Sequence, residues 1–267
     1  MRSYLSYFKL KFLTGLQYRA AAWAGIATQI FFGITYICVY VAFYESDSSN
    51  LPMPLNQLIS YLWLNQCFFS LILMWYKDRD ILGIIKNGNI AYELCRPQNL
   101  YLMWFSKMYG ERISKVVLRF LPVMIFAMLL PSPFNLDLST TLASFVISLI
   151  ALCLASILVT VIVLMYHIIC LFTIDEKGIV NTFMVLSDIL SGLTIPIVFF
   201  PNWLQKLSDF LPFRYVSDFP FRLYVGNIGV NEGLIGIVVQ IIWILIIVLV
   251  SNMLMKKALK KAVIQGG

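Results

Sequence analysis

The chain has 267 residues, of which 60% are hydrophobic and 12% are charged, with a mean hydropathy of +0.84. A soluble globular domain carries about 25% charged residues, so this composition excludes a soluble fold and indicates an integral membrane protein. The formal net charge of +7 suggests an anionic partner. Since the chain has no basic and aromatic surface module, we expect that partner to be anionic membrane lipid and not nucleic acid.

The chain begins with an amphipathic segment over residues 1–19. Its apolar side chains recur near helical spacing, with Lys9 and Lys11 toward another face: Leu5, Phe8, Phe12 and Leu16. This pattern predicts a helix lying in the cytoplasmic membrane interface, although the segment could also be an early start of the first span. No cleavable signal peptide is expected, because the first strongly apolar run starts near residue 20.

Six segments are candidates for crossing a bilayer, which takes about 20 apolar residues. They are residues 20–44, 57–76, 116–134, 140–172, 179–200 and 233–254. The sequence therefore predicts one all-α transmembrane domain over residues 1–267 with six transmembrane helices. The last segment is almost purely aliphatic, with Gln240 as its lone amide, and is expected to face lipid.

The basic residues between these segments predict the orientation of the chain. Of the 20 Lys and Arg residues, only Lys206, Arg214 and Arg222 fall on one side of the six predicted spans. The remainder lie in the N-terminal arm, in the connection after the second span, between spans four and five, and after the sixth span. Because basic residues accumulate on the cytoplasmic side, both termini are expected to be cytoplasmic.

The sequence carries no recognisable catalytic or nucleotide motif. It lacks GxxxxGK[ST], GxSxG, HExxH and any His/Cys cluster, and none of its five cysteines form a CxxC pair. The single histidine, His167, is near the cytoplasmic face, where a structural hydrogen bond is expected more often than a proton relay. We therefore expect no enzyme activity, no metal and no bound cofactor in this chain itself.

Polar side chains occur at membrane depth in two spans. Asn181, Asp188 and Ser191 share one helical face of the fifth span, and Asn65 and Gln66 lie in the second. A polar stripe on a membrane helix faces a partner helix or an aqueous path. Asp188 could bind substrate or a coupling cation, or it could complete a hydrogen-bond network between helices. The sequence leaves both roles open.

The connection over residues 77–115 contains apolar side chains that a solvated loop would not need. Gly88 and Pro97 bracket a short possible helix at 89–96. Something must cover the apolar residues of this connection: the membrane surface, the protein's own helices, or a cytoplasmic partner. They are Ile90, Leu94, Tyr101 and Trp104. A short helix between two spans is suited to receiving motion from such a partner.

The segment after the fifth span, SGLTIPIVFFPNWLQKLSDFLPF, interrupts a hydrophobic run with prolines. Trp203, Leu207, Phe210 and Leu211 lie on one side of a short amphipathic piece. Irregular backbone at membrane depth requires protein or water around it, so residues 201–232 could form an extracellular re-entrant element that closes the outer mouth of a pathway. They could equally form an interfacial loop anchored by Trp203 and Tyr215.

Two segments make the chain resemble the permease subunits of ABC-2 type ATP-binding-cassette transporters. The first is KNGNIAYELCRPQNLYLMWFSKMYG, which fits the pattern G-x-I-x-x-x-L-x-R-P through Gly88, Ile90, Leu94, Arg96 and Pro97. The second is SGLTIPIVFFPNWLQKLSDFLPFRYVSDFPFRLYVG, similar to a G…P…P-x-W…LPF…P pattern. The residues that fit it are Gly192, Pro196, Pro201, Trp203, Leu211, Pro212, Phe213 and Pro220.

The resemblance implies a function and a set of partners. Such a subunit pairs with a second permease chain, as a homodimer or heterodimer, and with two separate cytoplasmic ATPase subunits that bind ATP and Mg. Such transporters export drugs, peptides, lipids or polysaccharides, here across a bacterial plasma membrane. Among these, the aromatic-rich spans of this chain favour an amphipathic substrate such as a drug, peptide or lipid. The alternative is an ATP-independent secondary transporter or channel subunit that uses Asp188.

The resemblance also assigns sites. The ATPase-coupling interface would comprise Asn89, Ile90, Tyr92, Glu93, Leu94, Arg96 and Pro97. Spans two and five would line the translocation path, with Asn65, Gln66, Asn181, Asp188 and Ser191 as its polar residues. The extracellular gate would contain Pro196, Pro201, Trp203, Pro212 and Phe213.

Overall fold

The computed structural model describes residues 2–46, 51–95, 97–138, 140–173 and 178–261. Over these residues the chain forms twelve α-helices and two short 3-10 helices, which confirms the predicted all-α class. The α-helices are α1 (Arg2–Gln17), α2 (Arg19–Ser46), α3 (Leu55–Cys67), α4 (Phe69–Ile72), α5 (Arg79–Lys86), α6 (Ile90–Leu94), α7 (Leu100–Leu129), α8 (Leu142–Thr173), α9 (Ile179–Leu190), α10 (Asn202–Phe210), α11 (Asp218–Tyr224) and α12 (Val230–Lys261). The 3-10 helices are η1 (Ile197–Phe199) and η2 (Arg214–Val216).

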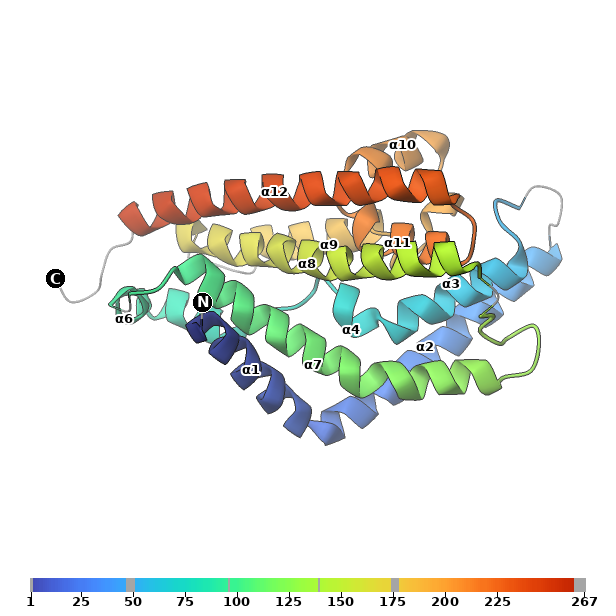
Figure 1. The fold of residues 1–267 in the computed structure, drawn as a ribbon, viewed down its shortest axis with the longest axis horizontal. Coiled ribbons are helices and arrows are strands. Elements are labelled where there is room, and N and C mark those ends of the chain that lie inside the picture. The colour runs from blue at the N-terminus through green and yellow to red at the C-terminus, as the bar shows by residue number, and fades with distance from the viewer. Residues whose placement is uncertain (1, 47–50, 96, 139, 174–177, 262–267) are drawn as a thin grey trace.

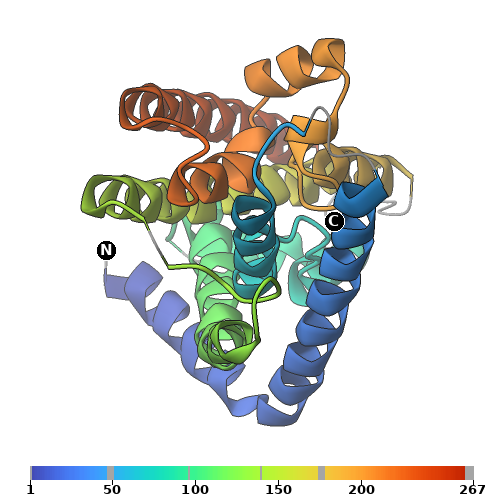
Figure 2. The ribbon, with the colours of Figure 1, turned by 90° about the vertical axis from the view of Figure 1, so that its right-hand side faces the viewer.

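The long helices run along the length of the molecule. Figure 1 shows α8 beside α12, α7 crossing below them, and α1 and α2 meeting at a corner on the lower edge. The α6 helix and the start of α7 lie at one end, here termed the α6 end, whereas α11 and the loop after α7 lie toward the other, the α11 end. Viewed along the long axis, α3 occupies the middle of the bundle (Figure 2). Its residues 58–67 are all buried accordingly.

Among the residues that the structure describes, three helices are long and apolar enough to cross a membrane: α2, α8 and α12. They coincide with the first, fourth and sixth predicted spans, so the chain is a membrane protein with apolar helical spans. The other three predicted spans stay predictions. Span two corresponds to α3 and α4, which are separated at Phe68, and span three to the second half of α7, which continues through Pro122.

The helix of the fifth predicted span is shorter than the predicted range 179–200, because α9 ends at Leu190. The chain turns at Gly192, whose φ of +78° is favourable only for glycine. A side chain at this position would also lie 3.1 Å from the Tyr61 hydroxyl and from the Cβ atom of Asp218. The backbone of this turn therefore approaches α3 and α11 more closely than another residue would allow.

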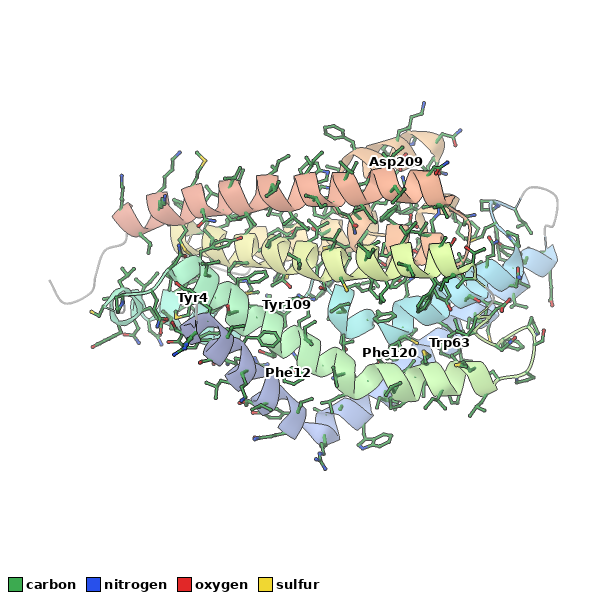
Figure 3. The ribbon with its side chains drawn as sticks, viewed as in Figure 1. Tyr4, Phe12, Trp63, Tyr109, Phe120 and Asp209 are labelled. Carbon is green, nitrogen blue, oxygen red and sulfur yellow. The ribbon has the colours of Figure 1, made fainter. Side chains whose placement is uncertain are left out.

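The predicted N-terminal helix is present as α1, which packs along the first half of α7. Of the predicted apolar face, Phe8, Phe12 and Leu16 are half-buried, whereas Leu5 is exposed. The Tyr4 hydroxyl accepts a hydrogen bond from the Asn99 backbone N–H at 2.9 Å, and Tyr4 and Phe12 mark the helix in Figure 3. These contacts tie α1 to the helix beside it.

Candidate functional site

The segment at the α6 end begins with a well-defined helix start. Asp78 Oδ1 accepts hydrogen bonds from the backbone N–H groups of Asp80 and Ile81, each at 3.0 Å, which makes Asp78 the N-cap of α5. The helix α5 buries Ile81, Leu82 and Ile85 and ends before Gly88, whose φ is +68°. The chain then turns into the short helix α6 (Figure 1).

The single histidine joins this segment to the long helix α8. His167 Nε2 accepts a hydrogen bond from the Asp78 backbone N–H at 3.0 Å, and His167 Nδ1 lies 2.8 Å from the Val163 carbonyl oxygen. The ring is therefore neutral, with its hydrogen on Nδ1. His167 is buried, as expected for the structural role that the sequence favoured. It fixes the start of α5 against α8.

The apolar residues of the connection divide into covered and uncovered groups. Ile90, Tyr101 and Trp104 are buried in the protein's own core, which answers what covers them. Tyr92 and Leu94 of α6 remain 75% and 43% exposed. Two apolar side chains thus project from a short helix whose base is anchored.

The other residues predicted for the coupling interface surround α6. Asn89 and Pro97 are exposed and Glu93 is half-buried, whereas Arg96 lies outside the described residues. The segment therefore presents polar and apolar groups together at the α6 end.

The polar residues predicted for the path are not gathered at one point. Asn65 and Gln66 are buried in α3, where Asn65 Oδ1 accepts a hydrogen bond from the Ser217 hydroxyl at 2.6 Å. Asn181 is exposed at the start of α9, and its side-chain oxygen accepts from Lys77 Nζ at 2.7 Å. These three residues make contacts with separate parts of the molecule.

Asp188 and Ser191 lie together at the far end of α9. The Ser191 hydroxyl donates to the Asp188 main-chain carbonyl at 2.8 Å. The Asp188 side chain is 8% exposed, and its Oδ1 atom has no hydrogen-bond partner among the described residues. It faces the Trp75 side chain and the Met74 backbone, in the extended segment after α4. Asp188 is therefore a buried acid beside the break in the second predicted span.

The predicted gate residues surround α10. Pro196 and Pro212 are buried and Phe213 is half-buried, whereas Pro201 and Trp203 are exposed. The apolar face of α10 is largely exposed, at 68%, 44% and 75% for Trp203, Leu207 and Phe210, and Phe210 makes an edge contact with Trp243 of α12. In Figure 1, α10 projects from the side of the molecule near the α11 end.

A buried ionic network behind this helix was not predicted. Asp218 is fully buried, and its Oδ2 atom lies 3.4 Å from Arg214 Nε and 3.3 Å from Arg222 Nη1. Arg214 also pairs with Asp209, which lies at the edge of the molecule (Figure 3). The network joins η2, α10 and α11 into one unit. The four-residue spacing of positions 214, 218 and 222 was the available signal, since ion pairs on a helix have this spacing; in the structure Arg214 lies in η2, and Asp218 and Arg222 share α11.

Arg112 is a second buried charge that was not predicted. Its Nη1 atom donates to the main-chain carbonyls of Leu71 and Leu73, at 2.6 and 2.8 Å. These carbonyls lie at the end of α4, where the backbone N–H groups that would bond to them within a helix are missing. The Arg112 guanidinium supplies hydrogen-bond donors in their place. Its position among the basic residues of the cytoplasmic connection gave no signal that it would be buried.

No group of three or more His, Cys, Asp or Glu side chains among the described residues could hold a metal ion. A comparison with protein-family models matches residues 69–266 to a family described as ABC-2 family transporter protein. Searches of curated proteins and of solved structures each gave no match. The matched range starts at α4 and contains both segments on which the sequence resemblance rests.

Proposed function

The chain belongs to the ABC-2 family of transporter proteins, and we propose that it is the permease subunit of an ATP-driven exporter. In this proposal two permease chains, identical or different, form the translocation path in a bacterial plasma membrane. ATP and Mg bind to separate ATPase subunits at the cytoplasmic side. The α6 end, with the start of α1 and the end of α12, faces the cytoplasm, and α10 and α11 face outside, which agrees with the distribution of basic residues.

The observation that carries this proposal is the exposure of Tyr92 and Leu94 on an anchored helix. Neighbouring exposed apolar side chains that lie outside the proposed bilayer have no lipid to cover them, so a protein partner is the cover proposed here. The base of α6 is fixed by the buried Ile90, and the preceding helix is fixed by the His167–Asp78 hydrogen bond. A push on α6 would therefore reach α8 and the segment after α4. This surface is suited to an ATPase subunit.

The path and the gate follow from the same proposal. Closure of the ATPase subunits moves α6, tilts α3, α4 and α9, and displaces α10 and α11 at the outer side. The turn at Gly192 contacts α3 and α11 together, so motion of the central helix reaches the outer element directly. The exposed aromatic side chains of the spans favour an amphipathic or apolar substrate over a small ion.

A second candidate function rests on Asp188. A buried carboxylate with an unpartnered oxygen at membrane depth is a feature of ion-coupled transporters. The substitution Asp188→Asn separates the two functions. Loss of proton- or sodium-driven uptake would support the secondary transporter, whereas surviving ATP-dependent export would count against it.

Co-purification tests the main proposal. The tagged chain, extracted in mild detergent, is expected to bring down a stoichiometric ATPase that bears a GxxxxGK[ST] loop. Leu94→Asp should remove this companion. Leu207→Asp, a matched control on α10 with 44% exposure against 43% for Leu94, should retain it. Purification of the chain alone, under conditions that preserve other membrane complexes, would refute the proposal.

A further inference from the structure

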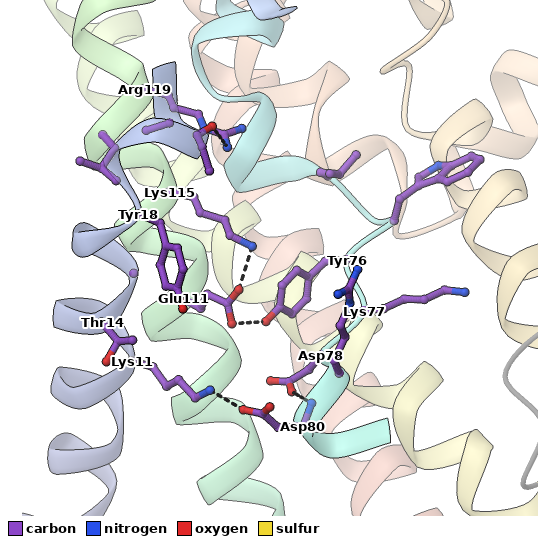
Figure 4. A pocket seen from close by; sticks show the side chains of 17 residues that line it. Lys11, Thr14, Tyr18, Tyr76, Lys77, Asp78, Asp80, Glu111, Lys115 and Arg119 are labelled. Atoms are coloured by element: carbon purple, nitrogen blue, oxygen red, sulfur yellow. Dashed lines mark hydrogen bonds and ion pairs between the residues drawn. The ribbon is translucent and has the colours of Figure 1, made fainter. Parts of the chain in front are cut away.

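A pocket of about 640 Å³ opens between α1, the start of α2, residues 73–80 and α7. Figure 4 shows its charged side chains, with Arg119 and Lys115 toward one end and Lys11 and Asp80 toward the other. Its volume is within the range of small-molecule sites, about 300–1,000 Å³. None of the residues proposed for the ATPase-coupling interface, the path or the gate lines this pocket.

The lining of the pocket is rich in basic residues. Five cations face three carboxylates: Lys11, Lys77, Arg79, Lys115 and Arg119 against Asp78, Asp80 and Glu111. Two of the three carboxylates are paired with lysines, and the third, Asp78, keeps one buried oxygen, Oδ2, without a hydrogen-bond partner among the described residues. Asp80 Oδ2 pairs with Lys11 at 2.6 Å, Glu111 Oε1 pairs with Lys115 at 2.8 Å, and Asp78 caps α5. The pocket therefore has positive charge left over.

Arg119 is the clearest case of a positive charge in this pocket without a carboxylate partner. Its guanidinium donates only to neutral oxygens among the described residues, the Ser70 hydroxyl and the Ala21 carbonyl, each at 3.3 Å. Its Nε atom is buried and has no hydrogen-bond partner there. A half-buried arginine at the edge of a bilayer with no carboxylate partner is stabilised when water or an anion reaches it.

The position of Arg119 indicates where the anion would come from. The guanidinium lies against Ala21 and Gly25, in the first turns of α2, which is one of the candidate spans. Two aromatic residues of the pocket lining, Tyr18 and Trp75, are 66% and 55% exposed. Exposed Trp and Tyr side chains gather at the level of lipid headgroups. Basic pockets between helices on the cytoplasmic side bind anionic headgroups.

We propose that this pocket binds the phosphate group of an anionic phospholipid from the cytoplasmic leaflet, with Arg119 as its principal ligand and Lys115 beside it. The cytoplasmic assignment rests on the orientation given in the proposed function. Exposed apolar side chains of α2, among them Trp23, provide a surface for the acyl chains. The lipid would complete the contact between α1, α2 and α7.

Native mass spectrometry of the purified full chain tests this proposal. Dioleoylphosphatidylglycerol is expected to bind with a stoichiometry near one, while dioleoylphosphatidylcholine does not. Arg119→Gln should weaken phosphatidylglycerol binding at least tenfold, and Lys206→Gln, on the exposed surface of α10, should leave it unchanged. Equal binding of both lipids, or full binding by Arg119→Gln, would overturn the proposal. Displacement of the lipid by millimolar inorganic phosphate would identify free phosphate as the ligand and would also overturn it.

Two further measurements keep the proposal testable if Arg119→Gln does not fold, and separate it from the proposed function. If Arg119→Gln does not fold, Gly25→Ala replaces it, because a Cβ atom at Gly25 would lie 2.3 Å from Arg119 Cζ and would displace the guanidinium without removing its charge. Gly83→Ala, which meets open space, is the control. In a variant that carries Cys38→Ser and Cys153→Ser, which removes the other two exposed cysteines of the described residues, a membrane-impermeant maleimide reports the side of Cys95. Labelling from outside would refute the orientation, and with it the proposed function. Failed lipid binding with Cys95 inside would refute the lipid site alone.

Discussion

The Tyr61 hydroxyl donates a hydrogen bond to the main-chain carbonyl of Gly192 at 3.0 Å and also lies 3.3 Å from Asp218 Oδ1. One side chain of the central helix α3 thus contacts the turn that ends α9 and the first residue of α11. The Asp218 backbone N–H donates to the Ser191 carbonyl at 3.1 Å, which closes the same junction from the other side. Three segments that are far apart in sequence are held together at this point.

Tyr61→Phe is expected to loosen this junction. The substitution keeps the ring but leaves the Gly192 carbonyl and the buried Asp218 carboxylate without the hydroxyl. An unsatisfied buried polar group costs about 1–3 kcal/mol, so the free energy of unfolding should fall by that amount. Denaturant titration in a fixed detergent measures it. Tyr40→Phe is the control, since no hydrogen bond of the Tyr40 hydroxyl is found among the described residues and its ring stacks on Phe199. Equal effects of the two variants would contradict the prediction.

The two acids that pair with Arg214 should differ sharply in importance. Asp218 is fully buried, whereas the Asp209 side chain is 51% exposed. Removing one partner of a buried ion pair costs about 3–5 kcal/mol, while an exposed pair contributes about 0–1 kcal/mol. Asp218→Asn should therefore lower the free energy of unfolding severely and Asp209→Asn only slightly. Comparable losses would show that Arg214 is held by the outer acid instead.

The apolar spans could be predicted because their signal is local. A run of apolar residues long enough to cross a bilayer is visible without knowledge of any neighbour, and α2, α8 and α12 agree with the predicted ranges. For α12 the run of apolar residues predicted the span but not which side of the helix is buried. Its outer face is exposed, as expected for a lipid-facing helix, but Gln240 is fully buried and donates to the carbonyls of Ala151 and Tyr215, at 3.0 and 2.9 Å.

The burial of the charged side chains could not be predicted, because the groups that bury them belong partly to distant segments, although the spacing of Asp218 from Arg214 and Arg222 is local. Asp218 is stabilised by Tyr61, which lies 157 positions earlier in the chain, and Arg112 by the carbonyls of a helix that ends near residue 72. The contacts with Tyr61 and with the α4 carbonyls cross long distances in sequence. For Asp188, burial beside Trp75 follows from the early end of α4, which hydrophobicity does not reveal.

The packing of α1 should weaken in acid. The hydrogen bond from Lys11 lowers the pKa of Asp80 from its ordinary value of 3.8. Burial raises the pKa of Glu111, but hydrogen bonds from Lys115 and Tyr76 outweigh it and lower that pKa from 4.5. A carboxylate with a lowered folded pKa contributes stability that is complete above the unfolded pKa and is lost as the pH falls through the folded pKa.

Hydrogen exchange of the α1 amides should therefore be constant between pH 7 and pH 5, once corrected for intrinsic exchange, and should lose protection as the pH falls below about 4.5. Lys11→Met should have less protection at neutral pH and a shallower decline in acid, because the Asp80 pKa then returns toward its ordinary value. A decline of the same steepness in Lys11→Met would show that another group controls the docking of α1.

Gly110→Ala should separate α1 from α7. A Cβ atom at Gly110 would lie 2.6 Å from the Phe8 carbonyl oxygen and 3.2 Å from the Phe8 Cα atom, so the backbone of α1 would have to move. Alanine is better than glycine in a helix interior by about 0.5–1 kcal/mol, which makes Gly83→Ala a matched control, since nothing lies within 4 Å of its added Cβ atom. We expect Gly83→Ala to be neutral or stabilising. Gly110→Ala should speed cleavage of α1 by protease severalfold, and equal cleavage of both variants would show that α1 can shift along α7 without losing its contacts.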